Sequence, residues 1–157
     1  MAAGALAQTV WNDRFAFPPL YGINDIDIVY FDDSDLSAEA EAAHSRRIRK
    51  LCTELPVWID VKNQARVYLW YTEKFGYAVR PYVSAGDAIA TFPATATAVG
   101  LQPHGKQLAL CAPFGLEALP GGIVRANKAR IVRQIYETKL MRWRKLWPDL
   151  TFIDWDT

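Results

Sequence analysis

The chain has 157 residues, of which 51% are hydrophobic and 22% are charged, and its formal net charge is +1. This size and composition suit one globular domain with a substantial core, and they exclude a disordered or low-complexity protein. Acidic residues gather toward the N-terminal end. Residues 1–60 contain ten acids and five bases, whereas residues 121–157 contain four acids and eight bases. We therefore expect the two ends of the chain to form surfaces of different charge.

The cysteines and the hydropathy pattern favour a cytoplasmic protein. Cys52 and Cys111 stand in apolar contexts without C-x-x-C spacing, which is typical of free thiols in a reducing compartment. The N-terminal stretch lacks the basic start of a signal peptide, and no apolar run is long enough to cross a membrane. We expect no membrane partner.

The N-terminal part of the chain predicts two helices and two strands. Apolar residues at helical spacing predict a helix over residues 4–15, which the Pro/Gly-marked loop 17–22 ends. Residues 25–31 alternate as a strand does, and residues 57–62 form a second alternating segment. Between them, residues 38–54 begin with acids and end with bases, as the helix dipole favours.

Helices and one hairpin are expected in the remainder of the chain. Residues 63–74, 84–90 and 93–99 predict helices, and residues 99–113 have the form of a hairpin. A long basic helix is expected at about residues 127–147, with its Trp and Tyr stripe in the core. Helices interleaved with short strands predict a mixed α/β (α+β) fold.

Two aspartates interrupt the first predicted strand. Asp25 and Asp27 are two residues apart, so their side chains project from the same face. Carboxylates this close repel each other unless a cation compensates, and Mg²⁺ prefers such oxygen ligands together with water and substrate phosphates. Asp60 shows the same anomaly in the second strand and is a candidate third ligand for phosphoryl or nucleotidyl transfer.

The alternative is that this acidic stretch is a solvated strand edge followed by a turn. Strand parity places Asp32 on the opposite face from the first two aspartates, and Asp33 and Asp35 belong to the predicted turn. We therefore expect these three to cap and turn the chain rather than to bind metal.

Other polar residues have a functional and a structural interpretation. Lys62, Asn63, Gln64 and Arg66 follow Asp60 and either line a nucleotide pocket or cap the next helix and face solvent. The C-terminal bases either bind a nucleic-acid acceptor such as RNA or form a solvated helix face. These bases are Arg125, Lys128, Arg130, Arg133, Arg142, Arg144 and Lys145.

Several stretches together resemble a known superfamily. They are GALAQTVWN (4–12), INDIDIVYFD (23–32), VKNQARVYLWY (61–71), FPATATAVG (92–100) and APFGLEAL (112–119). In this combination the chain resembles the nucleotidyltransferases typified by DNA polymerase beta. Within them it is similar to bacterial nucleotidyltransferase-like proteins whose substrate is unknown.

The resemblance implies a polymerase beta-like fold, a short mixed sheet flanked by helices, over residues 1–157 as one nucleotidyltransferase-like domain. It implies that Asp25 and Asp27 bind Mg²⁺, or Mn²⁺ in its place, and that Asp60 is a third ligand or activates an acceptor hydroxyl. The pair Gly4-Ala5 would open the helix whose amides approach the triphosphate. The implied reaction transfers a nucleoside monophosphate from an NTP to an unidentified hydroxyl.

The chain departs from the superfamily pattern in ways that favour a second hypothesis. The usual Gly-Ser or Gly-Gly pair is Gly4-Ala5, and the helix and strand expected before it are absent. We therefore expect an exposed sheet edge and self-association. A catalytically inactive nucleotide-binding or regulatory module is the alternative to an enzyme. A glycosyltransferase with an Asp-x-Asp site ranks lower, because its hydrophobic strand usually precedes the motif.

Overall fold

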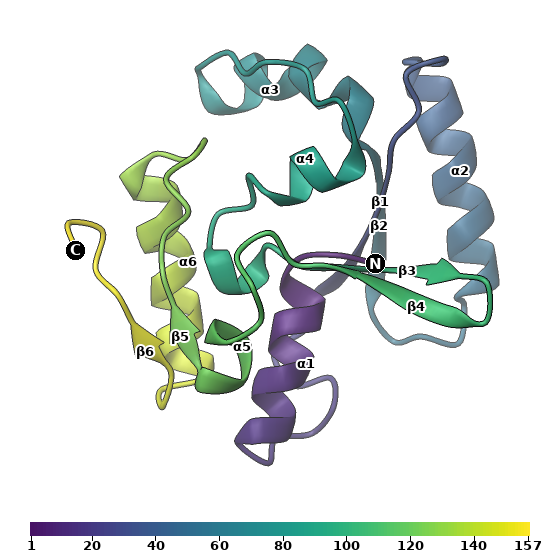
Figure 1. Ribbon diagram of the computed structural model, residues 1–157. Coiled ribbons are helices and arrows are strands. Elements are labelled where there is room, and N and C mark those ends of the chain that lie inside the picture. Colours follow the sequence, from purple (N-terminus) through teal and green to yellow (C-terminus); the bar gives the residue numbers. More distant parts are fainter.

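The computed structural model describes residues 1–157 and has a mixed α/β architecture (Figure 1). The α-helices are α1 (Gly4–Arg14), α2 (Ala38–Leu51), α3 (Val67–Phe75), α4 (Ala85–Ile89), α5 (Ala118–Gly121) and α6 (Arg133–Leu146). The strands are β1 (Asp25–Tyr30), β2 (Trp58–Asn63), β3 (Gly100–His104), β4 (Gln107–Cys111), β5 (Ile123–Val124) and β6 (Thr151–Phe152). Two 3₁₀ turns, η1 (Gln64–Arg66) and η2 (Thr95–Thr97), complete the chain.

The central element is the parallel pair β1–β2, whose register places Asp27 opposite Asp60. β3 and β4 form the predicted antiparallel hairpin. The first residues of the chain join the two ladders, because Ala2 bridges both Asp27 and Gly100. The order across the sheet is therefore β2, β1, the N-terminal residues, β3 and β4.

The N-terminal residues cover part of the β1 edge that was expected to be exposed, at Asp27. The Ala2 amide donates to the Asp27 carbonyl at 2.9 Å, and the Leu101 amide donates to the Met1 carbonyl at 2.8 Å. The Met1 ammonium also donates to the Leu101 carbonyl at 3.0 Å. The first of these bonds is made to β1 and the other two to β3, so residues 1 and 2 lie between the two strands and link them.

Helix α2 covers the outer edge of β2 with polar side chains one helical turn apart. Arg49 Nε donates to the Ile59 carbonyl at 2.7 Å, and Ser45 Oγ donates to the Val61 carbonyl at 3.3 Å. The third contact comes from Glu41, which accepts the Asn63 amide at 2.8 Å. Every second peptide of the edge strand is thus satisfied by a side chain, which prevents pairing with another strand.

The buried Asn63 side chain ties the ends of β1 and β2 together. Its Oδ1 accepts the amides of Asp32 and Ala65 at 3.0 and 3.1 Å, and its Nδ2 donates to the Asp32 carbonyl at 2.7 Å. With its own amide bound to Glu41, Asn63 fixes how β1 leaves the sheet and how the turn η1 begins.

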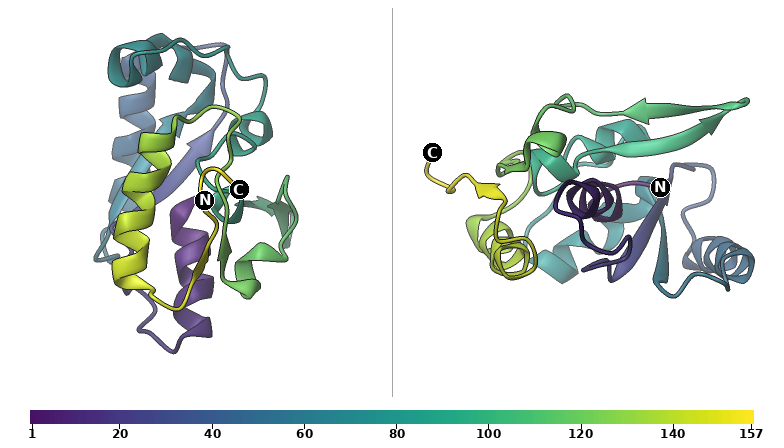
Figure 2. Two further views of the ribbon diagram at one scale, coloured as in Figure 1. Left: turned by 90° about the vertical axis from the view of Figure 1, so that its left-hand side faces the viewer. Right: turned by 90° about the horizontal axis from the view of Figure 1, so that it is seen from below.

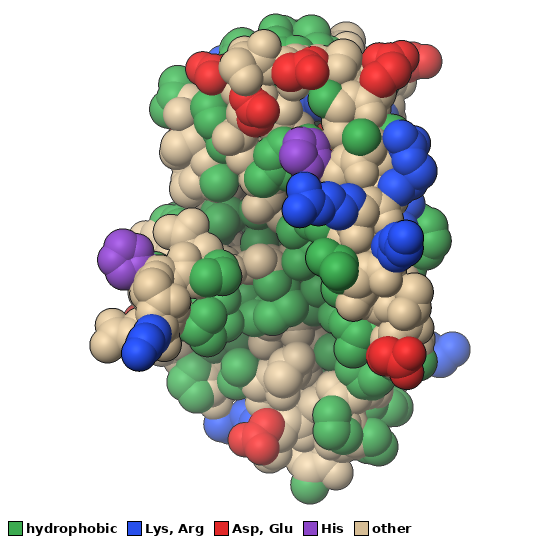
Figure 3. Space-filling view, turned by 90° about the vertical axis from the view of Figure 1, so that its right-hand side faces the viewer, with side chains coloured by type: hydrophobic (Ala, Val, Ile, Leu, Met, Phe, Trp, Pro, Cys, Tyr) green, Lys and Arg blue, Asp and Glu red, His purple; other side chains and the backbone are tan.

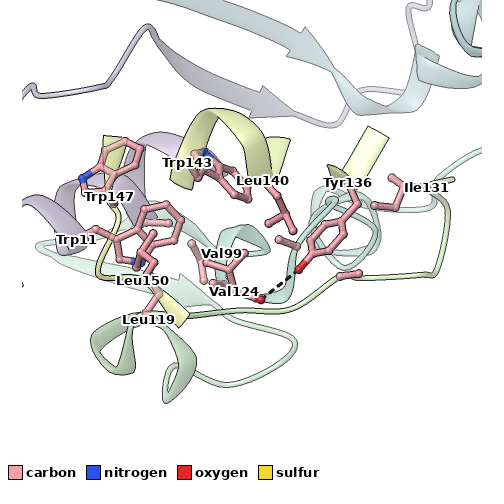
Figure 4. Close-up of a cluster of buried hydrophobic side chains, with 14 residues drawn as sticks. Trp11, Val99, Leu119, Val124, Ile131, Tyr136, Leu140, Trp143, Trp147 and Leu150 are labelled. Atoms are coloured by element: carbon pink, nitrogen blue, oxygen red, sulfur yellow. Dashed lines mark hydrogen bonds between the residues drawn. The ribbon is translucent and has the colours of Figure 1, made fainter. Parts of the chain in front are cut away.

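Most of the hydrophobic core lies between α1 and α6, away from the β1–β2 pair (Figure 4). Trp11 packs edge-on against Trp143 and Trp147, with ring centroids 5.6 and 5.4 Å apart. Trp147 Nε1 donates to Asn12 Oδ1 at 2.8 Å. The predicted aromatic stripe of the C-terminal helix is therefore core, and it positions α1 beside α6. Seen from below, α1 lies between α6 and the β1–β2 pair (Figure 2).

The long C-terminal helix begins later than the sequence predicts, at Arg133 instead of residue 127. Asn127 explains the difference, because its Nδ2 donates to the carbonyls of Ala90 and Phe92 at 2.7 and 2.9 Å. Ala126 also pairs with Ala94 in an isolated bridge. These long-range contacts hold the segment before α6 in an extended path.

The face opposite the main core is hollowed between α2 and the β3–β4 hairpin, and hydrophobic side chains cover its floor (Figure 3). A cavity of about 340 Å³ lies there, with Ile28, Ile89 and Leu101 among its lining residues. Cys52 and Cys111 are both free and half-buried. None of the helices combines the length and apolarity needed to span a bilayer.

Replacing Asn63 by Ala is expected to destabilise the fold by about 2–4 kcal/mol, because it removes several buried hydrogen bonds and leaves the Asp32 and Ala65 amides without this partner. Denaturant unfolding measures the change. Asp33→Ala is the matched control, since Asp33 is exposed in the adjacent turn and should change stability by less than about 0.5 kcal/mol. Equal stability of the two variants would contradict this role of Asn63.

Candidate functional site

Asp25 and Asp27 face a cavity of about 300 Å³ between β1, α1 and α6. The side chains and backbone that enclose it come from four parts of the fold. Its lining residues are Ala3, Gly4, Gln8, Asn24, Asp25, Asp27, Phe92, Pro93, Thr97, Lys139, Arg142 and Trp143. The core packing of α1 against α6 therefore also builds two walls of this cavity.

Asp27 is the electrostatic centre of the cavity. Burial, together with the neighbouring charges of Asp25 and Asp60, raises the pKa of its carboxyl to about 6. Lys139 and Lys62 lower that pKa, but by less. The ionised carboxylate is therefore destabilised in the folded protein and would be favoured by a bound cation.

Helix α6 contributes two cations to the cavity: Lys139, which had no predicted role, and Arg142, which was expected only as one of the C-terminal bases. Lys139 and Arg142 lie three residues apart, so they share one side of the helix. Desolvation lowers the pKa of Lys139, and the negative charges of Asp27 and Asp25 raise it by less. Part of the lysine side chain remains exposed to solvent. Arg142 is fixed at the rim by its bond to the Gly22 carbonyl at 2.6 Å.

The N-terminus of α1 opens into the same cavity. Ala3 has φ 63° and ψ −139°, a conformation rare for a residue with a side chain, and it turns the chain from the sheet into the helix. No side chain caps this helix start, so its first amides keep free donors. Gly4 is close to Gln8, whose Nε2 would lie 3.2 Å from an added Cβ. Such a helix start suits an anion, including a phosphate.

The third predicted ligand, Asp60, occupies a different position. It shares the sheet face of Asp27 through the parallel register, but its carboxylate lies 3.5 Å from Lys62 Nζ and 3.9 Å from Arg49 Nη2. No group of three or more His, Cys, Asp or Glu side chains is placed to hold a metal ion. The expected convergence of three carboxylates is therefore not observed, and Asp60 instead lies beside two cations.

The two carboxylates that face the cavity, Asp25 and Asp27, suit a hard divalent cation without Asp60. Both are oxygen ligands on one strand face that line the same cavity, and burial and the nearby carboxylates disfavour ionised Asp27, which a bound cation would offset. Mg²⁺ is often held by only one or two carboxylates, with water and substrate phosphates as its other ligands.

Three of the predicted nucleotide-binding residues line a cavity and three do not. Gly4 lines the carboxylate cavity, and Lys62 and Gln64 line a second cavity beside it. Ala5 is buried and lines neither. Asn63 and Arg66 also lie outside both cavities.

Arg66 makes structural contacts, as Asn63 does. Its Nη1 donates to Glu41 Oε1 at 2.9 Å, and its Nε donates to the Leu36 carbonyl at 3.2 Å. We therefore assign Asn63 and Arg66 to the support of the strand ends, in place of the expected contact with nucleotide.

The remaining aspartates of the acidic stretch form turns. Asp32 Oδ1 accepts the Ser34 amide and hydroxyl, which lowers the pKa of this carboxyl. Asp35 Oδ1 accepts the Ser37 amide at 2.9 Å, and Ser37 caps α2. The division of the stretch into strand aspartates and turn aspartates is confirmed.

The basic C-terminal residues do not form one free surface. Arg133 pairs with Glu137 and Asp156 at 2.6 and 2.8 Å, and Arg144 lies 3.5 Å from Asp154. These ion pairs partly neutralise Arg133 and Arg144, which are therefore less available to bind an external phosphate.

Asp27→Asn is expected to increase stability above pH 6. The folded-state pKa of about 6 exceeds the usual value of 3.8, so ionised Asp27 destabilises the folded protein. This destabilisation is absent below about pH 4 and complete above pH 6. The variant should gain about 1–2 kcal/mol over wild type at pH 7.5 without metal, and almost nothing at pH 4. Urea unfolding at both pH values measures this, with Asp33→Asn as control. A gain that is independent of pH would contradict the origin assigned to it.

The chain was compared with solved structures, curated protein sequences and protein-family models. A solved NMR structure described as revealing a CCA-adding enzyme head domain matches with a TM-score of 0.75 and 27% sequence identity, over 98% of this chain and 80% of that one. No curated protein sequence gives a significant match. The family model described as Nucleotidyltransferase matches residues 1–152. The chain therefore belongs to this nucleotidyltransferase family.

Proposed function

We propose that the protein transfers a nucleoside monophosphate from a nucleoside triphosphate to an acceptor hydroxyl, with Mg²⁺ held by Asp25 and Asp27. The observation that carries the proposal is the raised pKa of Asp27 in a cavity that also receives the start of α1. The carboxylate wall of this cavity attracts cations and the helix start attracts anions, as a bound metal–triphosphate complex requires.

In this proposal the chain mainly positions the triphosphate and neutralises its charge. The first amides of α1 donate to phosphate oxygens, and the side chains of Lys139 and Arg142 approach them from α6. The metal, when bound, supplies further neutralisation of the phosphate oxygens during in-line displacement.

Asp60 is proposed to orient the acceptor. Asp60 lies opposite Asp27 in the strand pair, and its carboxylate is only half-buried, so it can accept a hydrogen bond from an acceptor hydroxyl. The acceptor oxygen bonds to the α-phosphorus, the bond from that phosphorus to the pyrophosphate oxygen breaks, and the hydroxyl proton passes to Asp60 or to water. Lys62 keeps Asp60 close to this position.

A second candidate function is a nucleotide-binding module without turnover. The ion pairs of Asp60 with Lys62 and Arg49 favour it, because they leave only two carboxylates facing the cavity. Calorimetry with NTP and Mg²⁺ separates the two, since the module binds nucleotide and releases no pyrophosphate.

The acceptor is proposed to be a nucleic acid such as RNA, or another molecule with a free hydroxyl. Arg125 and Lys128 line a separate cavity of about 280 Å³ and make no ion pair within 4.0 Å, so they are available to phosphates. Binding through them would weaken as salt is raised.

Incubation with α-labelled NTPs, Mg²⁺ and cell extract tests the proposed function. Wild type should transfer label to an acceptor and release pyrophosphate. The double variant Asp25→Asn/Asp27→Asn should lose about 100-fold or more of this activity, because the metal ligands are removed. Asp33→Asn should retain it. Equal labelling by wild type and the double variant would refute the assignment of the site.

A further inference from the structure

A second cavity, of about 210 Å³, adjoins the carboxylate site. Phe92 and Pro93 line both cavities, so the two cavities are neighbours that meet at these residues. Lys62 is also at the boundary, since it lines the second cavity and its ammonium lies 3.5 Å from Asp60. The volume is below the range of about 300–1,000 Å³ typical of complete small-molecule sites, which suits one part of a larger ligand.

The second cavity contains a buried cation without a hydrogen-bond acceptor. Arg130 Nη1 and Nη2 are shielded from solvent, and neither donates to any protein atom. Asp87 is already bound on both oxygens by Arg80, at 2.8 and 3.0 Å. Arg130 instead lies over the Tyr82 ring, 4.2 Å from its centroid. Buried guanidinium groups nearly always have acceptors, so this one is poised for a ligand.

The backbone of Arg130 is held in place by a pair of tyrosines. Tyr77 Oη donates to the Arg130 carbonyl at 2.5 Å and lies 3.1 Å from Tyr71 Oη. The arginine therefore enters the cavity from a fixed point, which lowers the entropy cost of binding through it.

The walls of this cavity select for a flat ligand. Trp70, Tyr71, Tyr82 and Phe92 all line it, and aromatic side chains stack well on nucleobases. The two terminal nitrogens of an arginine form a planar fork that matches two adjacent acceptors. Guanine presents such a pair at N7 and O6, and cytosine presents one at O2 and N3. Adenine has a donor beside N7, so it matches the fork less well.

We propose that this second cavity binds the base of the nucleotide, with Arg130 donating to two adjacent acceptors on the base edge. The inference rests on the proposed function, since the triphosphate of the same nucleotide would lie against Asp25, Asp27 and the start of α1. Guanine and cytosine nucleotides are the preferred ligands. Arg130 is then the residue that determines base specificity.

Titration of the full chain with GMP, CMP, AMP and UMP, without metal, tests this inference by calorimetry. Wild type should bind GMP and CMP about 10-fold more tightly than AMP and UMP. Arg130→Lys keeps the charge and the contact with Tyr82 but loses the fork. It should remove this preference and weaken GMP and CMP by about 10-fold. Arg47→Lys, at an exposed position on α2, is the matched control and should bind as wild type does.

A second variant guards against a folding defect in the first. Trp70→Ala removes a wall of the cavity without touching Arg130, and it should weaken all four nucleotides by a similar factor. Wild-type binding by Arg130→Lys, or no base preference in wild type, would overturn the proposal. Equal competition by inorganic phosphate would also overturn it, by showing a simple anion site.

The outcomes separate this inference from the proposed function. Arg130-dependent base binding without label transfer would refute the reaction and leave the base site standing. Label transfer that needs Asp25 and Asp27 but is unchanged in rate and base preference by Arg130→Lys would refute the base site alone.

Discussion

The parallel register of β1 and β2 is the constraint on which the rest of the structure depends. It places Asp27 directly opposite Asp60 and sends both toward the same side of the sheet. Two flanking elements keep that register fixed: Ala2 pairs with the inner edge of β1, and α2 satisfies the outer edge of β2 through side chains. A slip of β2 by one residue would turn Asp60 to the opposite face of the sheet from Asp27.

The site combines a stability cost with a binding capacity. Burial and mutual repulsion disfavour ionised Asp27, and the tryptophan-rich contact between α1 and α6 supplies the packing that tolerates this cost. The same contact aims the uncapped start of α1 and Lys139 into the cavity. The elements that hold the fold together are therefore also those that concentrate positive potential where a triphosphate would lie.

Local patterns predicted the parts of the fold that depend on local chemistry. Strand parity separated Asp27 from Asp32, and the aromatic stripe of α6 identified its buried face. The sequence could not show that Asn127 would bind a distant carbonyl and so shift the start of α6, or that Arg49 would lie beside Asp60. Both depend on contacts between separate elements. The i, i+3 spacing of Lys139 and Arg142 placed them on one side of α6, but the sequence did not show that this side faces the carboxylate cavity.

The most direct test of the central claim is an NMR titration of the Asp27 carboxyl carbon with and without Mg²⁺. We expect the carboxyl to titrate near pH 6 in the metal-free protein, because it is buried beside other carboxylates, and well below that when Mg²⁺ is bound by Asp25 and Asp27. The same pKa in both samples, or a metal-free value close to the usual 3.8, would contradict a metal-dependent site on this strand.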